Sequence, residues 1–174
     1  MTTKKIPIWI DCDTGTDDTV AIMLAHALPE LEIVGLSAVA GNSLLSNTFP
    51  NTRRIVHLLG ASYPVYAGAD RPLVREPHVA GAFHGENGLG NVELPLPEQA
   101  PLTTPAWDAL YEAAKAMPGE LRLVATGPLT NVAIALTKYP DLKTLLHSIA
   151  LMGGAAVGGN VTPAAEFNIY DDPD

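Results

Sequence analysis

Short apolar runs alternate along the chain with segments that suit helices. The apolar runs predict strands at residues 6–10, 31–40, 64–68, 121–126 and 148–152. The segments between them predict helices at residues 19–28, 48–59, 107–117 and 128–136. Strands that alternate with helices in this way are typical of a parallel sheet that is covered on both faces. The pattern therefore predicts an α/β fold with an open, mainly parallel, doubly wound (Rossmann-like) sheet.

Polar or glycine-rich residues follow four of the predicted strands. These segments are Asp11 to Asp18, Gly41-Asn42, Thr126-Gly127 and Met152-Gly153-Gly154. Right-handed crossovers bring the carboxyl ends of parallel strands to one edge of the sheet. Open α/β sheets bind their ligands at that edge. The sequence thus predicts a ligand crevice formed by these four segments.

The first of these segments carries four carboxylates within eight residues, DCDTGTDD. Carboxylates at such spacing repel one another, and a hard divalent cation with oxygen ligands is the simplest compensation. We predict that Asp13 and Asp18 chelate a cation, and that Asp11 and Asp17 support it or bind hydroxyl groups. Capping of the following helix is the alternative, but it accounts for only one or two of the carboxylates.

Three further residues are candidates because of where they lie. Asn42 follows a strand at the same edge, although asparagine in a turn is usually structural. Thr126 offers a carbonyl or a hydroxyl group to the site, whereas Asn131 in the same turn is expected to be structural. His84 lies in the glycine-rich segment 70–105, and a loop of this length is usually functional or disordered. It could close over a substrate, or it could be a solvated surface loop.

Near the end of the chain, Asn160, Glu166 and Asn168 follow one another at spacings of six and two residues. Amide and carboxylate groups suit the hydroxyl groups of a polyol, which both donate and accept hydrogen bonds. A loop with local Asx turns is the alternative interpretation.

Composition narrows the class of protein. With 174 residues, 47% of them hydrophobic, the chain is long enough for a single α/β domain over residues 1–174. The net charge of −9 argues against a nucleic-acid partner. The lone Cys12 excludes an internal disulfide, fits a reducing compartment, and is expected to be a small buried residue rather than a metal ligand. No signal peptide or bilayer-spanning run is evident, so we expect a cytoplasmic protein with no membrane partner.

Residues 166–174 are followed by no further helix. A parallel sheet whose last crossover is missing would expose an edge or an apolar face. We therefore expect the domain to be incomplete at its C-terminus.

Taken together, these motifs resemble the nucleoside hydrolase family, of the inosine–uridine-preferring kind. The matching segments run in the order of the family along the whole chain: the DxDxxxDD pattern of Asp11–Asp18, Ala40-Gly41-Asn42, the HGENGL of residues 84–89, the ATGPLTN of residues 125–131, Met152-Gly153-Gly154, and Asn160 with Glu166-Phe167-Asn168. The joint match is far more specific than the DxD pattern alone.

The resemblance implies hydrolysis of the N-glycosidic bond of ribonucleosides to free base and ribose, with a tightly bound Ca²⁺. Asp13, Asp18 and the backbone carbonyl of Thr126 would ligate the ion. Asp13 would also accept the proton of the calcium-bound water that attacks the anomeric carbon. Asp11 would support the metal site from behind.

The resemblance also implies a substrate pocket. Its residues would be Asp17, Asn42 and Asn168 at the ribose 2′- and 3′-hydroxyls, Asn160 and Glu166 at the 5′-hydroxyl, Met152 along the ribose, and His84 near the base. Members of the family are commonly dimers or tetramers, so we expect a homo-oligomer. Base preference is left open, since purine- and pyrimidine-specific members share the ribose and calcium residues.

The chain departs from the family pattern at its end. The family has a further C-terminal part that carries another aspartate ligand and, in this subgroup, a histidine that protonates the leaving base; this chain ends at Asp174, before either. One alternative is therefore a truncated paralogue that holds calcium and ribose without turnover. Another is a haloacid-dehalogenase-like phosphatase with Asp11 as nucleophile and magnesium as cofactor, although Gly15 stands where that family has Thr or Val.

Overall fold

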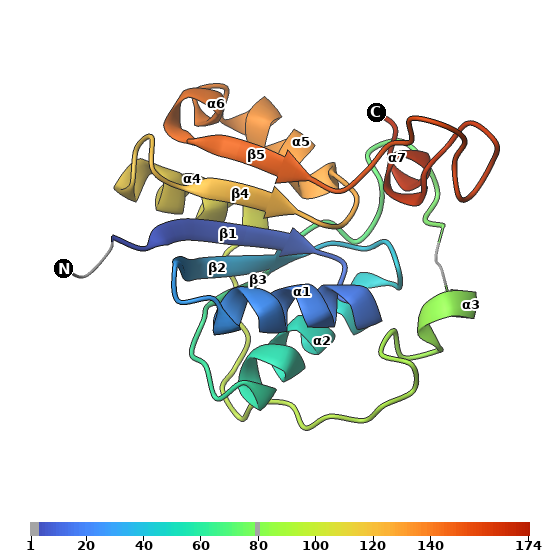
Figure 1. Ribbon diagram of the computed structural model, residues 1–174, viewed down its shortest axis with the longest axis horizontal. Coiled ribbons are helices and arrows are strands. Elements are labelled where there is room, and N and C mark those ends of the chain that lie inside the picture. Colours follow the sequence, from blue (N-terminus) through green and yellow to red (C-terminus); the bar gives the residue numbers. More distant parts are fainter. Residues whose placement is uncertain (1–3, 79–80) are drawn as a thin grey trace.

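A computed structural model describes residues 4–78 and 81–174. Within these ranges the chain forms a parallel sheet in the order β3-β2-β1-β4-β5, with helices on both faces (Figure 1). The strands are β1 (Ile6–Cys12), β2 (Leu31–Ala38), β3 (Val65–Ala67), β4 (Arg122–Ala125) and β5 (Ser148–Leu151). The predicted α/β fold with an open, parallel, doubly wound sheet is confirmed.

The strand order reverses once. From β1 the chain moves outward through β2 to β3, and then returns to the other side of β1 as β4 and β5. The carboxyl ends of β1 and β4 therefore form the topological switch point, where open α/β sheets have their ligand crevice.

Each face of the sheet has its own apolar core. Helices α1 (Thr16–Ala27) and α2 (Leu45–Leu58) cover one face, and α4 (Ala106–Ala116), α5 (Thr130–Lys138) and α6 (Leu142–Leu145) cover the other. Successive residues of β1 point to opposite cores: Ile8 and Ile10 pack under α1 and α2, whereas Trp9 packs with Leu123 under α4 to α6. Burial on both faces explains why β1 and β2 are nearly continuous apolar runs, whereas β5, at the edge of the sheet, is exposed along its whole length.

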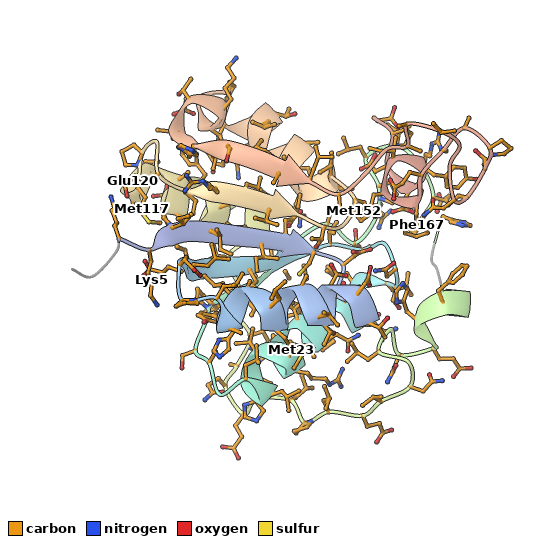
Figure 2. All side chains as sticks on the ribbon, viewed as in Figure 1. Lys5, Met23, Met117, Glu120, Met152 and Phe167 are labelled. Carbon is orange, nitrogen blue, oxygen red and sulfur yellow. The ribbon has the colours of Figure 1, made fainter. Side chains whose placement is uncertain are left out.

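The two ends of the sheet differ in character. Met152 and Phe167 lie at the carboxyl ends of the strands, whereas Lys5 and Glu120 lie at the opposite end (Figure 2). The polar segments that follow β1, β2, β4 and β5 all belong to the end marked by Met152. This is the edge at which the sequence predicts the crevice.

The first crossover differs from its predicted boundaries. β1 continues to Cys12, and α1 begins at Thr16 rather than at residue 19. The helix begins early because the Asp18 carboxylate accepts a hydrogen bond from the Gly15 backbone N–H (3.0 Å), one of the free amides at a helix start. The four carboxylates are therefore divided between a strand end, a short turn and the first helical turn. The other predicted elements agree with the structure to within three residues at each end.

Three short helices were not predicted: α3 (Gly81–His84), α6 and α7 (Phe167–Asp171). Four or five residues are too few to show a helical period. Helix α7 depends on Glu166, whose carboxylate accepts the backbone N–H groups of Asn168 and Ile169. In the described ranges, none of the helices combines the length and the apolar character needed to cross a bilayer.

The core assignment predicts different costs for two leucine truncations. Leu123 is fully buried, whereas Leu24 on α1 is 58% exposed. We expect Leu123→Ala to lower the free energy of unfolding by about 2–5 kcal/mol through lost contacts and a cavity. Leu24→Ala should change it by no more than about 0.5 kcal/mol. Urea unfolding measures both, and equal losses would contradict the assignment.

Candidate active site

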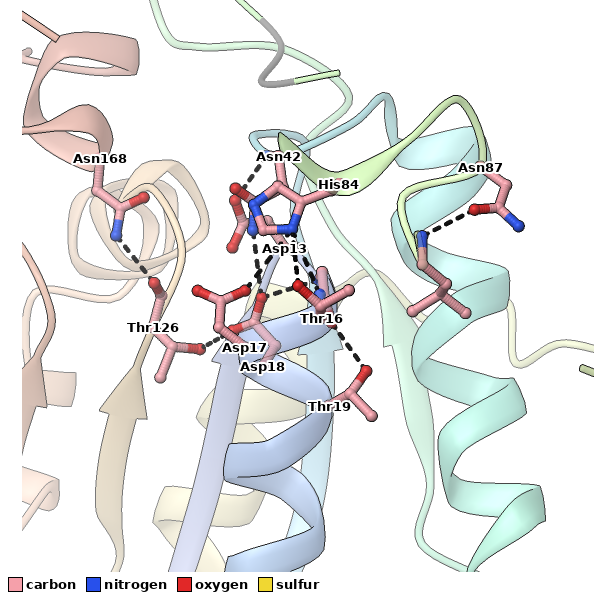
Figure 3. A network of polar contacts seen from close by, with 12 residues as sticks. Asp13, Thr16, Asp17, Asp18, Thr19, Asn42, His84, Asn87, Thr126 and Asn168 are labelled. Carbon is pink, nitrogen blue, oxygen red and sulfur yellow. Dashed lines mark hydrogen bonds and ion pairs between the residues drawn. The ribbon is translucent and has the colours of Figure 1, made fainter. Parts of the chain in front are cut away.

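Asp13 lies in the turn between β1 and α1 (Figure 3), and two glycines enclose its side chain. Its side chain is 1% exposed, and Oδ2 accepts a hydrogen bond from the backbone N–H of Asn42 (2.7 Å). A Cβ atom at Gly127 would lie 2.8 Å from Asp13 Oδ1, and one at Gly41 would collide with Oδ2. Glycine at these two strand ends therefore leaves the space that the carboxylate occupies.

Asp18 brings a second buried carboxylate beside the first. Its Oδ1 accepts a hydrogen bond from the Thr126 hydroxyl (2.6 Å), and its Oδ2 accepts from the Gly15 N–H (3.0 Å) and the Asn42 amide (3.4 Å), as Figure 3 shows in part. All of these donors are neutral. In the described ranges, neither Asp13 nor Asp18 forms an ion pair with a cationic side chain.

Burial dominates the electrostatics of this pair. It raises the pKa of Asp13 well above the usual value, and the charge of Asp18 raises it further. Burial likewise raises the pKa of Asp18, against the lowering effect of the hydrogen bonds from Thr126 and Gly15. Two carboxylates in one buried site cannot both ionise cheaply without a counter-charge. The site therefore favours either a shared proton or a bound cation.

Asp11 is enclosed at the end of β1. Its Oδ1 accepts hydrogen bonds from the Ser37 hydroxyl and the Asn131 amide, and its Oδ2 has no hydrogen-bond partner among the described residues. Burial raises the pKa of Asp11 to about 6, although the two hydrogen bonds act in the opposite direction. Because two protein donors occupy its Oδ1, Asp11 is poorly placed to be the nucleophile that the phosphatase alternative requires.

Thr126 and Asn168 join β4 to α7. The Asn168 Nδ2 donates to the backbone carbonyls of Thr126 (2.8 Å) and Met152 (2.9 Å). Asn168 is 4% exposed, and the described ranges contain no hydrogen-bond donor to its Oδ1. The amide orientation thus leaves Oδ1 as an acceptor. Met152 is half exposed beside it.

Glu166 and Asn160 have contrasting surroundings. Glu166 is 6% exposed, and its carboxylate accepts the backbone N–H groups of Gly154, Asn168 and Ile169. It therefore caps α7 and ties that helix to the segment after β5. Asn160 is exposed, and its side chain forms no hydrogen bond with the parts of the chain that the structure describes. The structure brings Glu166 to the site but leaves Asn160 outside it.

His84 approaches the site from the glycine-rich loop. Its Nδ1 lies 3.2 Å from the Thr16 hydroxyl oxygen and 3.4 Å from the Thr16 backbone nitrogen, at the start of α1. The Asp17 carboxylate, whose side chain is 73% exposed, lies 4.0 Å from the same nitrogen. His84 and Asp17 thus lie together at the rim of the site that contains Asp13 (Figure 3).

Some contacts of these residues were not predicted. The Trp9 indole donates to the Ser37 hydroxyl (2.8 Å), which in turn donates to Asp11. Ser37 could have been suspected, as the one hydroxyl residue in an apolar strand. Asn131, expected to be structural, holds both Asp11 and the backbone N–H of Ala69. Cys12 is fully buried, as predicted.

The site suits a hard cation only in part. The carboxylates of Asp13 and Asp18 and the carbonyl of Thr126 are oxygen donors, which Ca²⁺ and Mg²⁺ prefer. Among the described residues, however, no three His, Cys, Asp or Glu side chains gather closely enough to form a metal site by themselves. Ca²⁺ takes about six to eight oxygen ligands. Water, substrate hydroxyls or additional polypeptide would have to supply the rest.

The raised pKa of Asp11 predicts a pH-dependent stability. Because its pKa is about 6 in the folded chain against an ordinary 3.8, the folded state keeps this proton longer as the pH rises. Its contribution to stability is therefore full below about pH 4, and it is lost as the pH rises from 4 through 6, by roughly 3 kcal/mol.

Thermal unfolding with a chelator, followed by circular dichroism from pH 4 to 7, measures this effect. The wild-type Tm should fall relative to that of Asp11→Asn, whose neutral amide does not titrate. Parallel pH profiles for the two proteins would contradict the raised pKa.

The geometry can be compared with known proteins. The family model described as inosine-uridine preferring nucleoside hydrolase matches residues 8–174. The pyrimidine-specific ribonucleoside hydrolase RihA of Citrobacter koseri is 44% identical over 170 residues, which cover 97% of this chain and 54% of the relative. The chain thus spans about half the length of the curated relatives it matches.

Solved structures show the same likeness. A plant nucleoside hydrolase, the PpNRh1 enzyme, has a TM-score of 0.93 at 38% identity, with 97% of this chain and 54% of that chain covered. The purine-preferring ribonucleoside hydrolase from Gardnerella vaginalis also has a TM-score of 0.93, at 37% identity, with 97% and 55% covered. Sequence and fold agree over nearly the whole chain, which therefore belongs to the inosine-uridine preferring nucleoside hydrolase family.

Proposed function

We propose that the protein hydrolyses the N-glycosidic bond of ribonucleosides and releases free base and ribose. The observation that carries this proposal is the buried pair Asp13 and Asp18 at the switch point, which no cationic side chain of the described ranges neutralises. Cleavage of a glycosidic bond builds positive charge on the sugar. A preformed anionic site stabilises that charge as it develops. Membership of the family supports the same reaction.

Asp13 is the candidate general base. The Asn42 N–H holds one of its oxygens, and the other faces Gly127, where no side chain intervenes. A carboxylate fixed in this way can accept the proton of an attacking water without reorganising. Asp11, held by Ser37 and Asn131, would support the turn that carries Asp13.

We propose Ca²⁺ as the cofactor, with Asp13, Asp18 and the Thr126 carbonyl as its protein ligands. When bound, the ion would orient the attacking water and lower the pKa of that water. The oxygen-only set of donors and the burial of two carboxylates support this assignment.

The ribose would lie against Asn42, Asn168 and Asp17. The free Oδ1 of Asn168 can accept a hydrogen bond from a 2′- or 3′-hydroxyl, and the exposed Asp17 carboxylate can do the same from the rim. Met152, half exposed beside Asn168, would line the ribose, and His84 would lie near the base.

The 5′-hydroxyl is proposed to meet Glu166 and Asn160. The Glu166 carboxylate accepts three backbone N–H groups, so it has acceptor capacity left for one more donor. Asn160 is exposed, and its loop would have to fold inward to reach a substrate.

Base preference is not part of the proposal. One relative is named pyrimidine-specific and another purine-preferring, and each match covers 97% of the chain. We keep the sequence-based expectations of a cytoplasmic location and a homo-oligomer as parts of the proposal.

An activity assay tests the proposed reaction. The purified chain is incubated with inosine, uridine, adenosine and cytidine, with Ca²⁺ or with a chelator, and free base is resolved by chromatography. We expect base release that requires Ca²⁺ and falls by about 10²-fold or more in Asp13→Asn, which keeps the shape of the side chain but is a far weaker base.

A chimera tests whether the rest of a full-length relative is needed for activity. In it, this chain replaces the matching 170 residues of the Citrobacter koseri relative. Release by the chimera alone would mean that the rest of the relative completes the site. Binding of Ca²⁺ and ribose without release by either protein would favour the non-catalytic alternative. If neither protein bound Ca²⁺ and ribose and neither released base, this result would contradict the proposed function.

The close approach of Gly127 to Asp13 predicts that a substitution there weakens calcium binding selectively. Gly127→Ala would place a Cβ atom 2.8 Å from Asp13 Oδ1 and displace the carboxylate, whereas Gly153→Ala meets its nearest atom at 3.4 Å. We expect the calcium affinity to fall roughly tenfold or more in the first variant and to change little in the second, because a carboxylate displaced from its hydrogen bond also loses its ligand geometry. Isothermal titration calorimetry measures both, and equal affinities would contradict the assignment of Asp13 as a ligand.

A further inference from the structure

Helix α7 contacts the turn after β4 at two points. At one point Asn168 donates to the carbonyl of Thr126 (2.8 Å); at the other, the Asp172 carboxylate accepts a hydrogen bond from the hydroxyl of Thr130. Asn168 lies in the first turn of α7, and Asp172 is the residue that follows its last. The helix and its C-terminal cap therefore contact both ends of the turn from Thr126 to the first residue of α5.

The second contact is well buried. Asp172 is 5% exposed and Thr130 is 2% exposed. The same carboxylate oxygen also accepts the backbone N–H of Leu73 (3.2 Å), in the segment that follows β3. Asp172 thus ties the end of α7 to two separate parts of the carboxyl edge.

A helix of five residues needs such contacts, because helices of that length do not form alone in water. Glu166 fixes the start of α7, and Asp172 fixes its end. Asn168 lies between them, so the direction of its amide depends on both ends. With only the first end held, α7 could pivot about Glu166 and carry Asn168 away from Thr126.

We propose that Asp172 and Thr130 are positioning residues that hold Asn168 against the Thr126 carbonyl and so aim its Oδ1 at the sugar. This inference deepens the proposed function, since it assigns the aim of a proposed ribose ligand. Within the described ranges, neither Asp172 nor Thr130 forms a hydrogen bond with Asp13 or Asp18.

The first test follows the Asn168 side-chain amide by ¹⁵N–¹H NMR, with its signals assigned by their loss in Asn168→Asp. In Thr130→Val, which keeps the shape of the side chain but removes the hydroxyl, the signals should shift toward those of a solvated asparagine and exchange faster with water. Thr130→Ser should restore them, because it restores the donor. Unchanged signals in Thr130→Val would overturn the proposal, whether or not the chain binds ribose.

A control is Thr144→Val, which removes an exposed hydroxyl from another short helix, α6, where Thr144 donates to the Asp141 carbonyl (2.7 Å). It should leave the Asn168 signals in place. If it moved them as Thr130→Val does, the effect would be one of general stability, and the proposal would fail.

A double-mutant cycle tests whether Thr130 affects ribose binding through Asn168. D-ribose affinity in the presence of Ca²⁺, measured by titration, should fall roughly tenfold in Thr130→Val and in Asn168→Ala, and the double variant should be no weaker than Asn168→Ala alone. Additive losses would overturn the claim that Thr130 acts through Asn168. Absence of ribose binding by the wild type would count against the proposed function, and the NMR comparison would still decide whether the contact positions Asn168.

Discussion

The burial of Asp13 beside Asp18 is the constraint on which the rest of the site depends. Two carboxylates at 1% and 3% exposure repel each other in a medium that solvates charge poorly, so the arrangement is costly to the fold. The surrounding chain donates hydrogen bonds to the two carboxylates from neutral groups, which are the Asn42 and Gly15 backbone amides and the Thr126 hydroxyl. These donors orient the two carboxylates but leave their charge uncompensated, which is the condition that favours a cation.

The topology of the sheet explains why the two buried carboxylates lie at this point of the fold. Asp13 and Asp18 come from the β1–α1 crossover and Thr126 from the end of β4, and these two strands adjoin at the switch point. Helices leave the two strands on opposite faces of the sheet, so the space between the strand ends is open. Glycines 41 and 127 keep that space free of side chains. The two buried carboxylates lower the stability of the fold at this point, and a ligand that binds there would raise it again.

Helix α7 is a second part of the site whose position depends on polar contacts. It brings Asn168 onto the Thr126 carbonyl, although it is separated from β4 by more than forty residues of chain. Since five residues cannot hold a helix by themselves, hydrogen bonds that the Glu166 and Asp172 carboxylates accept secure it. The part of the site that contains Asn168 therefore depends on a few polar contacts, whereas the carboxylate pair is held at the end of the central strands.

The sequence by itself determined the fold class, the order of strands and helices, and the edge that collects Asp13, Asp18, Asn42 and Thr126. It could do so because strand and helix periods are local, and because parallel strands must end on one side. Only the tertiary structure decided that α1 begins at Thr16, that Ser37 and Asn131 enclose Asp11, and that α7 forms at all. The enclosure of Asp11 and the contact of α7 with Thr130 depend on hydrogen bonds between residues far apart in the chain, and no local pattern encodes such partners. The start of α1 depends instead on the local bond from Gly15 to Asp18, which a carboxylate near a helix start permits but does not require.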